Sequence, residues 1–318
     1  MEICILGSGT WGTALSQVLS DNNHNIAVWS RKVPRNKIES IKYISDINLV
    51  INYDVLIIAI PSHAIYEVFK TIELNKDIII INCSKGFDPN TYKPISKLLN
   101  ESFKINIKNY FVLSGPSHSE EVIRRIPTAM VLSSKNIQKT KIFQKELSTK
   151  YFRIYSSDDV IGLEIAGLCK NIISIAAGIC IGLKYGDNTI AALISRGINE
   201  ITKFGAIFKA DYKTFYGLGG IGDLSVTSFS NHSRNRKFGI HIGNNKDIAY
   251  AQNKVGMVVE GLSATEIVYL LSKKHKINMP IVNEVYSILF NNKCPKSAIN
   301  ELMSRELKLE FNKHIEVS

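Results

Sequence analysis

The chain has 318 residues, of which 45% are hydrophobic and 21% are charged, so it is long enough for two globular domains with separate cores. This composition excludes a disordered or fibrous protein. The net charge is +11, from 39 basic and 28 acidic residues, but the lysines are scattered and form no basic stripe with interleaved aromatic residues. We therefore expect an anionic small-molecule ligand and no nucleic-acid partner.

The five cysteines are odd in number, widely spaced and free of any C-x-x-C pair. We expect neither a metal site nor a disulfide framework, and a reducing compartment fits this pattern. The chain enters a strand-like run at Ile3 with no basic leader before it, so we expect no signal peptide and a cytoplasmic location.

The first half of the chain alternates short apolar runs with helical patterns. Nearly continuous apolar runs are typical of strands buried on both faces of a parallel sheet. We predict strands at 3–6, 26–29, 55–60, 78–83 and 111–113, and further strands at 129–132 and 152–155. Helical patterns at 13–20 and 64–71 lie between them, so the α/β rhythm predicts a Rossmann-type doubly wound sheet.

The rhythm changes after the last predicted strand. Serine and aspartate at 156–159 offer N-cap residues for a long apolar helix over 160–183. Its length suits a transmembrane span, but Glu164 and Lys170 would be costly in lipid, so we predict a buried helix and no integral membrane segment. More helical patterns follow at 189–204, 263–275, 281–290 and 298–306. They predict an all-α C-terminal domain over 157–318, after a dinucleotide-binding domain over 1–156.

A glycine-rich motif, Gly7-Ser8-Gly9-Thr10-Trp11-Gly12, lies between the first predicted strand and the first predicted helix. A G-x-G-x-x-G motif in this position is typical of dinucleotide binding. The first glycine permits the tight turn, the second lets the backbone approach a pyrophosphate, and the third permits close packing of helix on sheet. The helix N-terminus adds amide donors and the positive end of its dipole.

The end of the second predicted strand bears on the choice of cofactor. An NAD-selective site usually has Asp or Glu there for the ribose hydroxyl, but this chain has Ser30 and Arg31. Arg31 is either a partner for the 2′-phosphate of NADP or a solvated surface residue. The sequence leaves the choice between NAD and NADP open.

Three polar motifs follow predicted strands: Ile60-Pro61-Ser62-His63, Lys85-Gly86 and Ser114-Gly115-Pro116-Ser117. Open α/β sheets place ligands at the carboxyl ends of their strands, so we expect these motifs to converge on one site. The prolines also suit plain turns, and His63 fits a helix N-terminus with no catalytic part.

Lys170 stands in the middle of the long apolar helix. Burial of an ammonium group lowers its pKa, which would allow proton exchange near neutral pH. We expect the polar side chains of Asn171 and Glu164 to lie near its ammonium group.

Further along the chain, a glycine-rich loop at 219–222 presents Asp223, and Thr227 follows one helical turn later. The segment 231–236 then gathers hydroxyl, guanidinium and amide groups, as a phosphate or small polyol requires. The alternative is that Ser233-Arg234-Asn235 only caps a helix and binds no ligand.

Taken in order, these motifs resemble the bacterial NAD(P)-dependent glycerol-3-phosphate dehydrogenases, from Ile3 to about Leu302. The series also includes K-N at 170–171, G-D-L at 222–224, S-R-N-R at 233–236 and V-V-E-G at 258–261. The resemblance implies reversible reduction of dihydroxyacetone phosphate to sn-glycerol 3-phosphate with NAD or NADP as cofactor, in the service of phospholipid synthesis. We also expect a homodimer.

The resemblance assigns roles to individual residues, with Lys170 as the proton-transfer residue. The catalytic group would be Lys170, Asp223, Lys85 and Thr227. The substrate contacts would be Lys85, Gly115, Ser117, Lys170, Asp223, Ser233, Arg234 and Asn235. The cofactor contacts would be Gly7, Gly9, Thr10, Trp11, Gly12, Arg31, Lys85, Ser119, Arg234, Val258 and Glu260.

Departures from the family and three alternatives stand beside this interpretation. His118 stands where the family usually has an aromatic carbocycle, and Ser119 stands where alanine is common. The segment from Arg31 to Asp54 is shorter than is usual in the family, which leaves contacts near the adenosine open. The alternatives are a related dehydrogenase of a β-hydroxyacid or 6-phosphogluconate, a non-catalytic NAD(P)-sensing module, and a nucleic-acid binder. The motif order argues against the first. A sensor would not need Lys170, Asp223 and the 233–235 cluster together, and a nucleic-acid binder would show a basic stripe.

Overall fold

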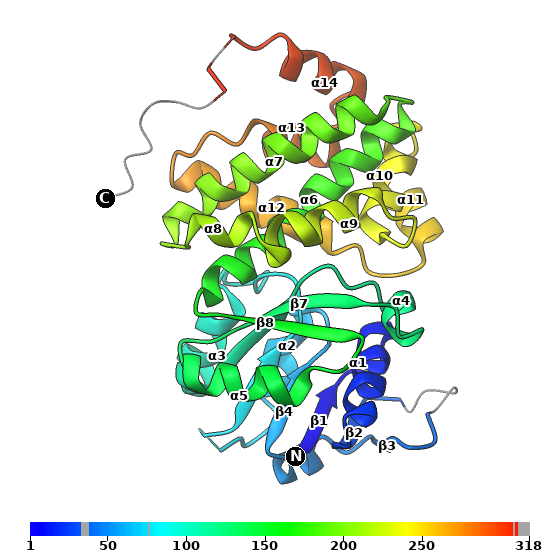
Figure 1. Cartoon of the computed structure of the whole chain (residues 1–318). Helices are drawn as coiled ribbons and strands as arrows, with labels where there is room; N and C mark the ends of the chain where they lie inside the picture. Colours follow the sequence, from blue (N-terminus) through cyan, green and yellow to red (C-terminus); the bar gives the residue numbers. More distant parts are fainter. Residues whose placement is uncertain (33–37, 76, 308, 311–318) are drawn as a thin grey trace.

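The computed structural model describes residues 1–32, 38–75, 77–307 and 309–310 (Figure 1). A sheet with flanking helices forms one half of the molecule, and a cluster of helices forms the other. The strands are β1 (Glu2–Leu6), β2 (Asn25–Trp29), β3 (Lys42–Ile44), β4 (Val55–Ile58), β5 (Ile79–Asn82), β6 (Tyr110–Ser114), β7 (Thr128–Ser133) and β8 (Phe152–Ser157). The helices of the first half are α1 (Thr10–Asp21), α2 (Ser62–Phe69), α3 (Ile95–Phe103), α4 (Ser119–Ile123) and α5 (Ile137–Leu147).

The eight strands form one sheet in the order β3-β2-β1-β4-β5-β6-β7-β8. All neighbours pair in parallel except β6 and β7, which are antiparallel. From β1 the chain adds strands towards one edge of the sheet, and from β4 it adds them towards the other edge. Open α/β sheets bind ligands at such a switch point, which here lies between β1 and β4. The predicted Rossmann-type doubly wound sheet is confirmed.

Every predicted strand is present. The central strands are apolar runs buried in the sheet, whereas in the edge strand β8 only Phe152 and Ile154 are buried. The sequence missed β3, a three-residue edge strand with only Ile44 buried, which carries no apolar run. It also missed α5, where only Thr140, Phe143 and Leu147 are buried. The predicted strand at 55–60 ends at Ile58, since the chain then turns towards Pro61 at the start of α2.

The second half is helical. Its helices are α6 (Val160–Gly182), α7 (Asp187–Ile207), α8 (Tyr212–Phe215), α9 (Asp223–Phe229), α10 (Arg234–Gly243), α11 (Ile248–Val255), α12 (Glu260–Lys274), α13 (Pro280–Phe290) and α14 (Pro295–Met303). Short 3-10 turns cover Ile47–Asn52 and Ile107–Asn109, and a π-helical turn covers Leu218–Gly222. The all-α second half is confirmed. The predicted division at residues 156 and 157 falls at the end of β8.

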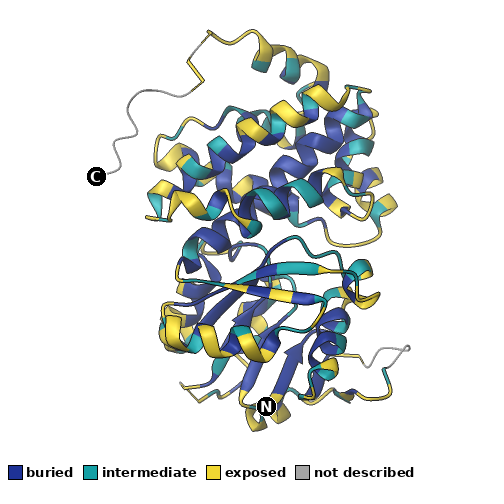
Figure 2. Cartoon of the chain, in the orientation of Figure 1, coloured by how far each residue is buried: buried dark blue, intermediate teal, exposed yellow. Residues whose placement is uncertain are grey.

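Helix α6 runs through the middle of this half and is buried almost throughout (Figure 2). Among the described residues it alone is long and apolar enough to cross a membrane, but 89% of its most apolar window is buried inside the protein. It is a core helix. Its first turn is capped by Asp159, whose carboxylate accepts a hydrogen bond from the Gly162 amide at 3.0 Å. Val160 and Leu163 pack into the core of the sheet, while the later turns form the core of the helical half.

Helices α6 and α10 cross in close contact because glycines line both of them. Gly178 and Gly182 of α6 face Gly239 and Gly243 of α10. A Cβ atom on Gly239 would overlap the carbonyl oxygen of Ile175, and each of the other three glycines faces a backbone carbonyl in the same way. The seam therefore holds the N-terminus of α10 beside the middle of α6.

The five cysteines are all free thiols. Burial raises the pKa of Cys4 and Cys83 to about 12 and that of Cys180 to about 11, and it also raises the pKa of Cys169. Cys294 is exposed before α14, where the backbone amides of the helix start lower the pKa of its thiol.

Gly239→Ala tests the glycine seam. Alanine favours a helix interior by about 0.5–1 kcal/mol over glycine, but the overlap with Ile175 should outweigh this, since overpacking costs about 1–3 kcal/mol. We expect the free energy of unfolding in urea to fall by about 1–2 kcal/mol. Gly186→Ala is the control, because its added Cβ meets nothing within 4 Å, and it should change stability by less than about 1 kcal/mol. Equal stabilities in the two variants would contradict the close crossing.

Candidate active site

Three charged side chains meet between the helical half and the carboxyl ends of the strands. Asp223, the first residue of α9, is 1% exposed. One of its carboxylate oxygens accepts a hydrogen bond from Lys170 Nζ at 2.6 Å, and the other accepts one from Lys85 Nζ at 2.7 Å. One carboxylate thus serves two ammonium groups, which leaves the centre with a net positive charge when both lysines are protonated.

The local fold explains how Asp223 reaches this place. The π-helical turn before it contains Gly219 and Gly220, at which a side chain would overlap Leu163 and the backbone of Phe215. The turn can therefore lie directly against α6. Thr227 follows Asp223 by one helical turn, and its hydroxyl oxygen accepts a hydrogen bond from Lys170 Nζ at 2.9 Å.

Burial and neighbouring charge set the protonation of this group. Burial lowers the pKa of Lys170 to about 7; the Asp223 carboxylate opposes this shift and the Lys85 ammonium adds to it. Burial also lowers the pKa of Lys85, but Asp223, with Lys170 and Glu260, raises it, and the net result is a pKa of Lys85 above its usual range. Burial raises the pKa of Asp223, but the two lysines bring it below its usual range. Near neutral pH, Lys170 can therefore both give and take a proton.

A chain of amide hydrogen bonds links this group to α10 and α12. Asn171 donates to the carbonyl oxygen of Lys85 at 3.4 Å and accepts from the Asn235 side chain at 2.9 Å. The Asn235 carbonyl oxygen in turn accepts from the Gly261 amide at 3.0 Å. Asn235, predicted as a substrate contact, is thus buried and engaged within the protein.

Ser174 makes a second link that the sequence analysis did not include. Its hydroxyl donates to the Thr227 carbonyl oxygen at 2.8 Å and lies 3.1 Å from the hydroxyl of Ser233. The signal was a polar residue one turn after Lys170 on the same face of an apolar helix. Ser233, predicted as a substrate contact, is buried and caps α10, whereas Arg234 is exposed at the first residue of that helix.

Glu164 does not lie beside the Lys170 ammonium group, so the expectation that its carboxylate would be a polar neighbour of Lys170 is wrong. Its carboxylate accepts hydrogen bonds from Ser96 and Tyr110 instead. Six residues turn an α-helix by about 240°, so Glu164 and Lys170 point to different sides of α6.

The three motifs at the ends of β4, β5 and β6 come together. The Gly115 carbonyl oxygen accepts from Lys85 Nζ at 3.5 Å and from the Ser117 hydroxyl at 2.9 Å. A Cβ on Gly86 would lie 2.7 Å from the Ser62 hydroxyl oxygen. His63 is exposed in the first turn of α2.

The turn between β1 and α1 forms a cradle for an anion. Gly7 has a φ of +119°, which favours glycine, and a side chain on Gly12 would overlap the Gly7 carbonyl oxygen. A Cβ atom added to Gly9 would meet nothing within 4 Å, so the space in front of Gly9 is open. No side chain caps the first amides of α1. Thr10 and Trp11 begin that helix. These residues fit a pyrophosphate, because free amides at a helix N-terminus bind phosphates.

The other predicted cofactor contacts lie around this cradle. Arg31 is exposed two residues after the end of β2, and Ser119 begins α4, which packs against α1. In the helical half, Val258 is exposed and Glu260 begins α12, close enough to Lys85 to raise its pKa. In the shortened segment from Arg31 to Asp54, residues 33–37 lie outside the described residues.

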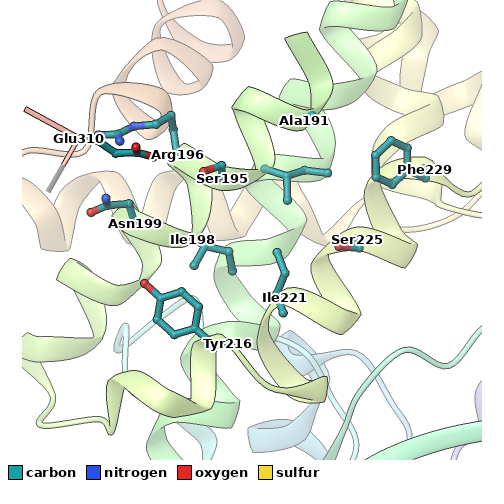
Figure 3. Close-up of a pocket in the computed structure, with 11 residues that line it drawn as sticks. Ala191, Ser195, Arg196, Ile198, Asn199, Tyr216, Ile221, Ser225, Phe229 and Glu310 are labelled. Atoms are coloured by element: carbon teal, nitrogen blue, oxygen red, sulfur yellow. The ribbon is translucent and has the colours of Figure 1, made fainter. Parts of the chain in front are cut away.

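A separate pocket of about 410 Å³ lies on the outer side of α7 and α9 (Figure 3). Its walls include Ile194, Ile198, Tyr216 and Phe229. Ser225 faces this pocket from the side of α9 opposite Asp223, since two residues turn a helix by about 200°. None of its lining residues belongs to the group around Lys170.

Comparison with known proteins agrees with this geometry. The family model for the N-terminus of NAD-dependent glycerol-3-phosphate dehydrogenase matches residues 2–140, and the model for its C-terminus matches residues 159–300. The chain is 42% identical to a glycerol-3-phosphate dehydrogenase [NAD(P)+] of Thermoanaerobacter sp. (strain X514), covering 98% of this chain and 99% of that one.

Solved structures give the same picture. The crystal structure of glycerol-3-phosphate dehydrogenase from Coxiella burnetii matches with a TM-score of 0.88 and 34% identity, over 95% of this chain and 98% of that one. The Plasmodium falciparum glycerol-3-phosphate dehydrogenase has a TM-score of 0.87 at 24% identity, over 97% of each chain, and at that identity it supports the fold alone.

Proposed function

The chain belongs to the NAD-dependent glycerol-3-phosphate dehydrogenase family, and from that premise we propose that Lys170 transfers the proton in its reaction. The protein is an NAD(P)-dependent oxidoreductase that interconverts dihydroxyacetone phosphate and glycerol 3-phosphate. The observation that carries the proposal is the buried Lys170 ammonium, held at 2.6 Å from Asp223, with Lys85 on the other carboxylate oxygen.

The cradle at the start of α1 supports the proposed position of the cofactor. We propose that Gly7, Gly9, Thr10, Trp11 and Gly12 hold its pyrophosphate, because no side chain caps the first amides of α1 and the space in front of Gly9 is open. The Gly7 amide itself donates to the Trp29 carbonyl oxygen at 2.8 Å, so Gly7 shapes the turn. When bound, the nicotinamide supplies or accepts the hydride. Ser119, Val258, Glu260, Lys85, Arg31 and Arg234 are proposed as further cofactor contacts.

The proton moves at Lys170 Nζ. In the reducing direction the C2 carbonyl oxygen of dihydroxyacetone phosphate gains negative charge as hydride reaches C2. The Lys170 ammonium stabilises that oxygen and then protonates it. In the oxidising direction the neutral amine takes the proton from the C2 hydroxyl. Asp223 and Thr227 orient Lys170, and Lys85 adds positive charge beside the reacting oxygen.

The substrate phosphate needs a cation at the edge of this centre. We propose Arg234 for this role, since it is exposed at the N-terminus of α10, where the helix dipole also favours an anion. Ser233 and Asn235 are buried on either side of it and hold its backbone against α6. Gly115 and Ser117 approach from the sheet.

Three broader points are also proposed. Five free thiols are consistent with the reducing cytoplasm. Glycerol 3-phosphate is the backbone of phospholipids, which makes lipid synthesis the expected destination of the product. The homodimer expected from the family resemblance can be checked by sedimentation velocity.

Lys170→Met tests the proton transfer. It keeps the stem but removes the charge and the proton, so kcat should fall about a hundredfold or more, since general acid–base catalysis contributes about 10²–10⁴-fold. The exposed Lys184→Met, just beyond α6, is the control and should keep the wild-type kcat. In the wild type, the pKa of about 7 for Lys170 makes kcat/KM for oxidation rise with pH through that value, and kcat/KM for reduction fall. A folded Lys170→Met enzyme with full kcat would rule the assignment out.

Arg234→Ala tests the phosphate contact. A hydrogen bond to a charged group contributes about 1.5–3 kcal/mol, so kcat/KM for dihydroxyacetone phosphate should fall roughly ten- to a hundredfold. Unphosphorylated dihydroxyacetone should react with both enzymes at similar rates. Lys237→Ala, one turn further along α10 and also exposed, serves as the matched control. Equal losses on both ketones would contradict the phosphate role.

Arg31→Ala tests cofactor choice. If Arg31 pairs with the 2′-phosphate, wild-type enzyme should use NADPH at least as well as NADH, and the variant should show a raised KM for NADPH alone. NADH, which lacks that phosphate, is the internal control. A wild-type enzyme that uses only NADH would identify Arg31 as a surface residue.

A further inference from the structure

Glu164 forms a buried junction between the two halves of the molecule. Its side chain comes from α6, is 4% exposed, and reaches the start of α3 in the sheet half. One carboxylate oxygen accepts from the Ser96 amide and from the Tyr110 hydroxyl, each at 2.8 Å. The other accepts from the Ser96 hydroxyl at 2.6 Å. No residue next to α3 in sequence caps that helix with a side chain, so Glu164 serves as its cap from across the junction.

The same stretch of α6 carries the reactive lysine. Lys170 lies six residues beyond Glu164, which is about 9 Å along the helix axis. Between them, Gly167 faces the stem of Lys85, whose Cβ and Cγ would lie 3.6 Å from an added Cβ. Any slide or rotation of α6 on the sheet half would therefore change where Lys170 stands relative to Lys85 and to the cofactor cradle.

We propose that Glu164 is a positioning residue for the dehydrogenase reaction, which fixes α6 on α3 and β6 so that Lys170 meets its substrate in register with the bound cofactor. This inference rests on the proposed role of Lys170. Catalysis is sensitive to such placement, because an error of about 1 Å can cost about a hundredfold in rate. Cofactor and substrate binding depend on other residues and should change much less.

The hydrogen bonds show which replacement keeps the junction. Both the Ser96 amide and the Tyr110 hydroxyl donate to the same oxygen of Glu164, so a glutamine can offer its carbonyl oxygen there. Its NH₂ group then faces the Ser96 hydroxyl, which can accept as well as donate. Glu164→Gln should preserve the geometry without the charge. Glu164→Met keeps the length but accepts no hydrogen bond.

Glu200 provides the matched control. It is also 4% exposed, and its carboxylate accepts from the Ile281 and Val282 amides at the start of α13, within the helical half. Glu200→Met should lower the melting temperature as much as Glu164→Met does, because each change removes a buried helix cap. It should leave kcat unchanged, since the junction with the sheet half is untouched.

The experiment measures kcat, the KM for both substrates and the melting temperature of the full-length variants. We expect Glu164→Met to lower kcat about tenfold or more with KM values within about threefold of wild type, and Glu164→Gln to stay within about threefold in kcat. If Glu164→Met does not fold, Ser96→Ala combined with Tyr110→Phe removes both hydroxyl donors and should give the same split. Full kcat in the variants that break the junction, or a Glu164→Gln as slow as Glu164→Met, would overturn the proposal.

A double variant separates this proposal from the role of Lys170. If Glu164 acts through Lys170, adding Glu164→Met to Lys170→Met should cost no further kcat. A further tenfold loss would overturn the proposed route through Lys170. Full activity in Lys170→Met alone would instead refute the proposed function, whatever Glu164 does.

Discussion

The close crossing of α6 and α10 is the contact on which the arrangement of the site depends. Glycines on both helices bring the two backbones together, so that Ser174 of α6 and Ser233 of α10 can share a hydrogen bond. A wider crossing would move Asn235 away from Asn171, next to Lys170. The same helix α6 reaches into the sheet half through its first turns. A single helix thus carries Lys170 and contacts both the sheet half and the start of α10.

Within that frame, the chemistry comes from an imbalance of charge. One buried carboxylate faces two ammonium groups, and the less exposed lysine is the one whose pKa falls towards neutrality. Burial of an unpaired charge is costly, so the pairing keeps the lysines inside, and the incomplete neutralisation keeps Lys170 able to exchange its proton. The surplus positive charge also suits a substrate that carries a phosphate.

The sequence predicted the sheet and the glycine-rich turn after β1, because apolar runs and G-x-G-x-x-G are local signals. A lysine inside an apolar helix is also a local signal. The pairing of Lys85 with Asp223 was beyond its reach, since the two residues are 138 positions apart and meet only through the packing of α9 on α6. The edge strand β3 has too few buried residues to give a pattern. Glu164 was misplaced although its helical phase relative to Lys170 was readable, because proximity in sequence was taken for proximity in space.

The distribution of the thiols has a practical consequence. Cys4, Cys83, Cys169 and Cys180 are buried and protonated near neutral pH, so a maleimide dye or spin label has little access to them. Cys294 is exposed and its pKa is lowered, at the start of α14 on the side of the helical half away from the sheet in Figure 1. The unaltered chain therefore offers one attachment point for a spectroscopic reporter, on the far side of the helical half from the sheet.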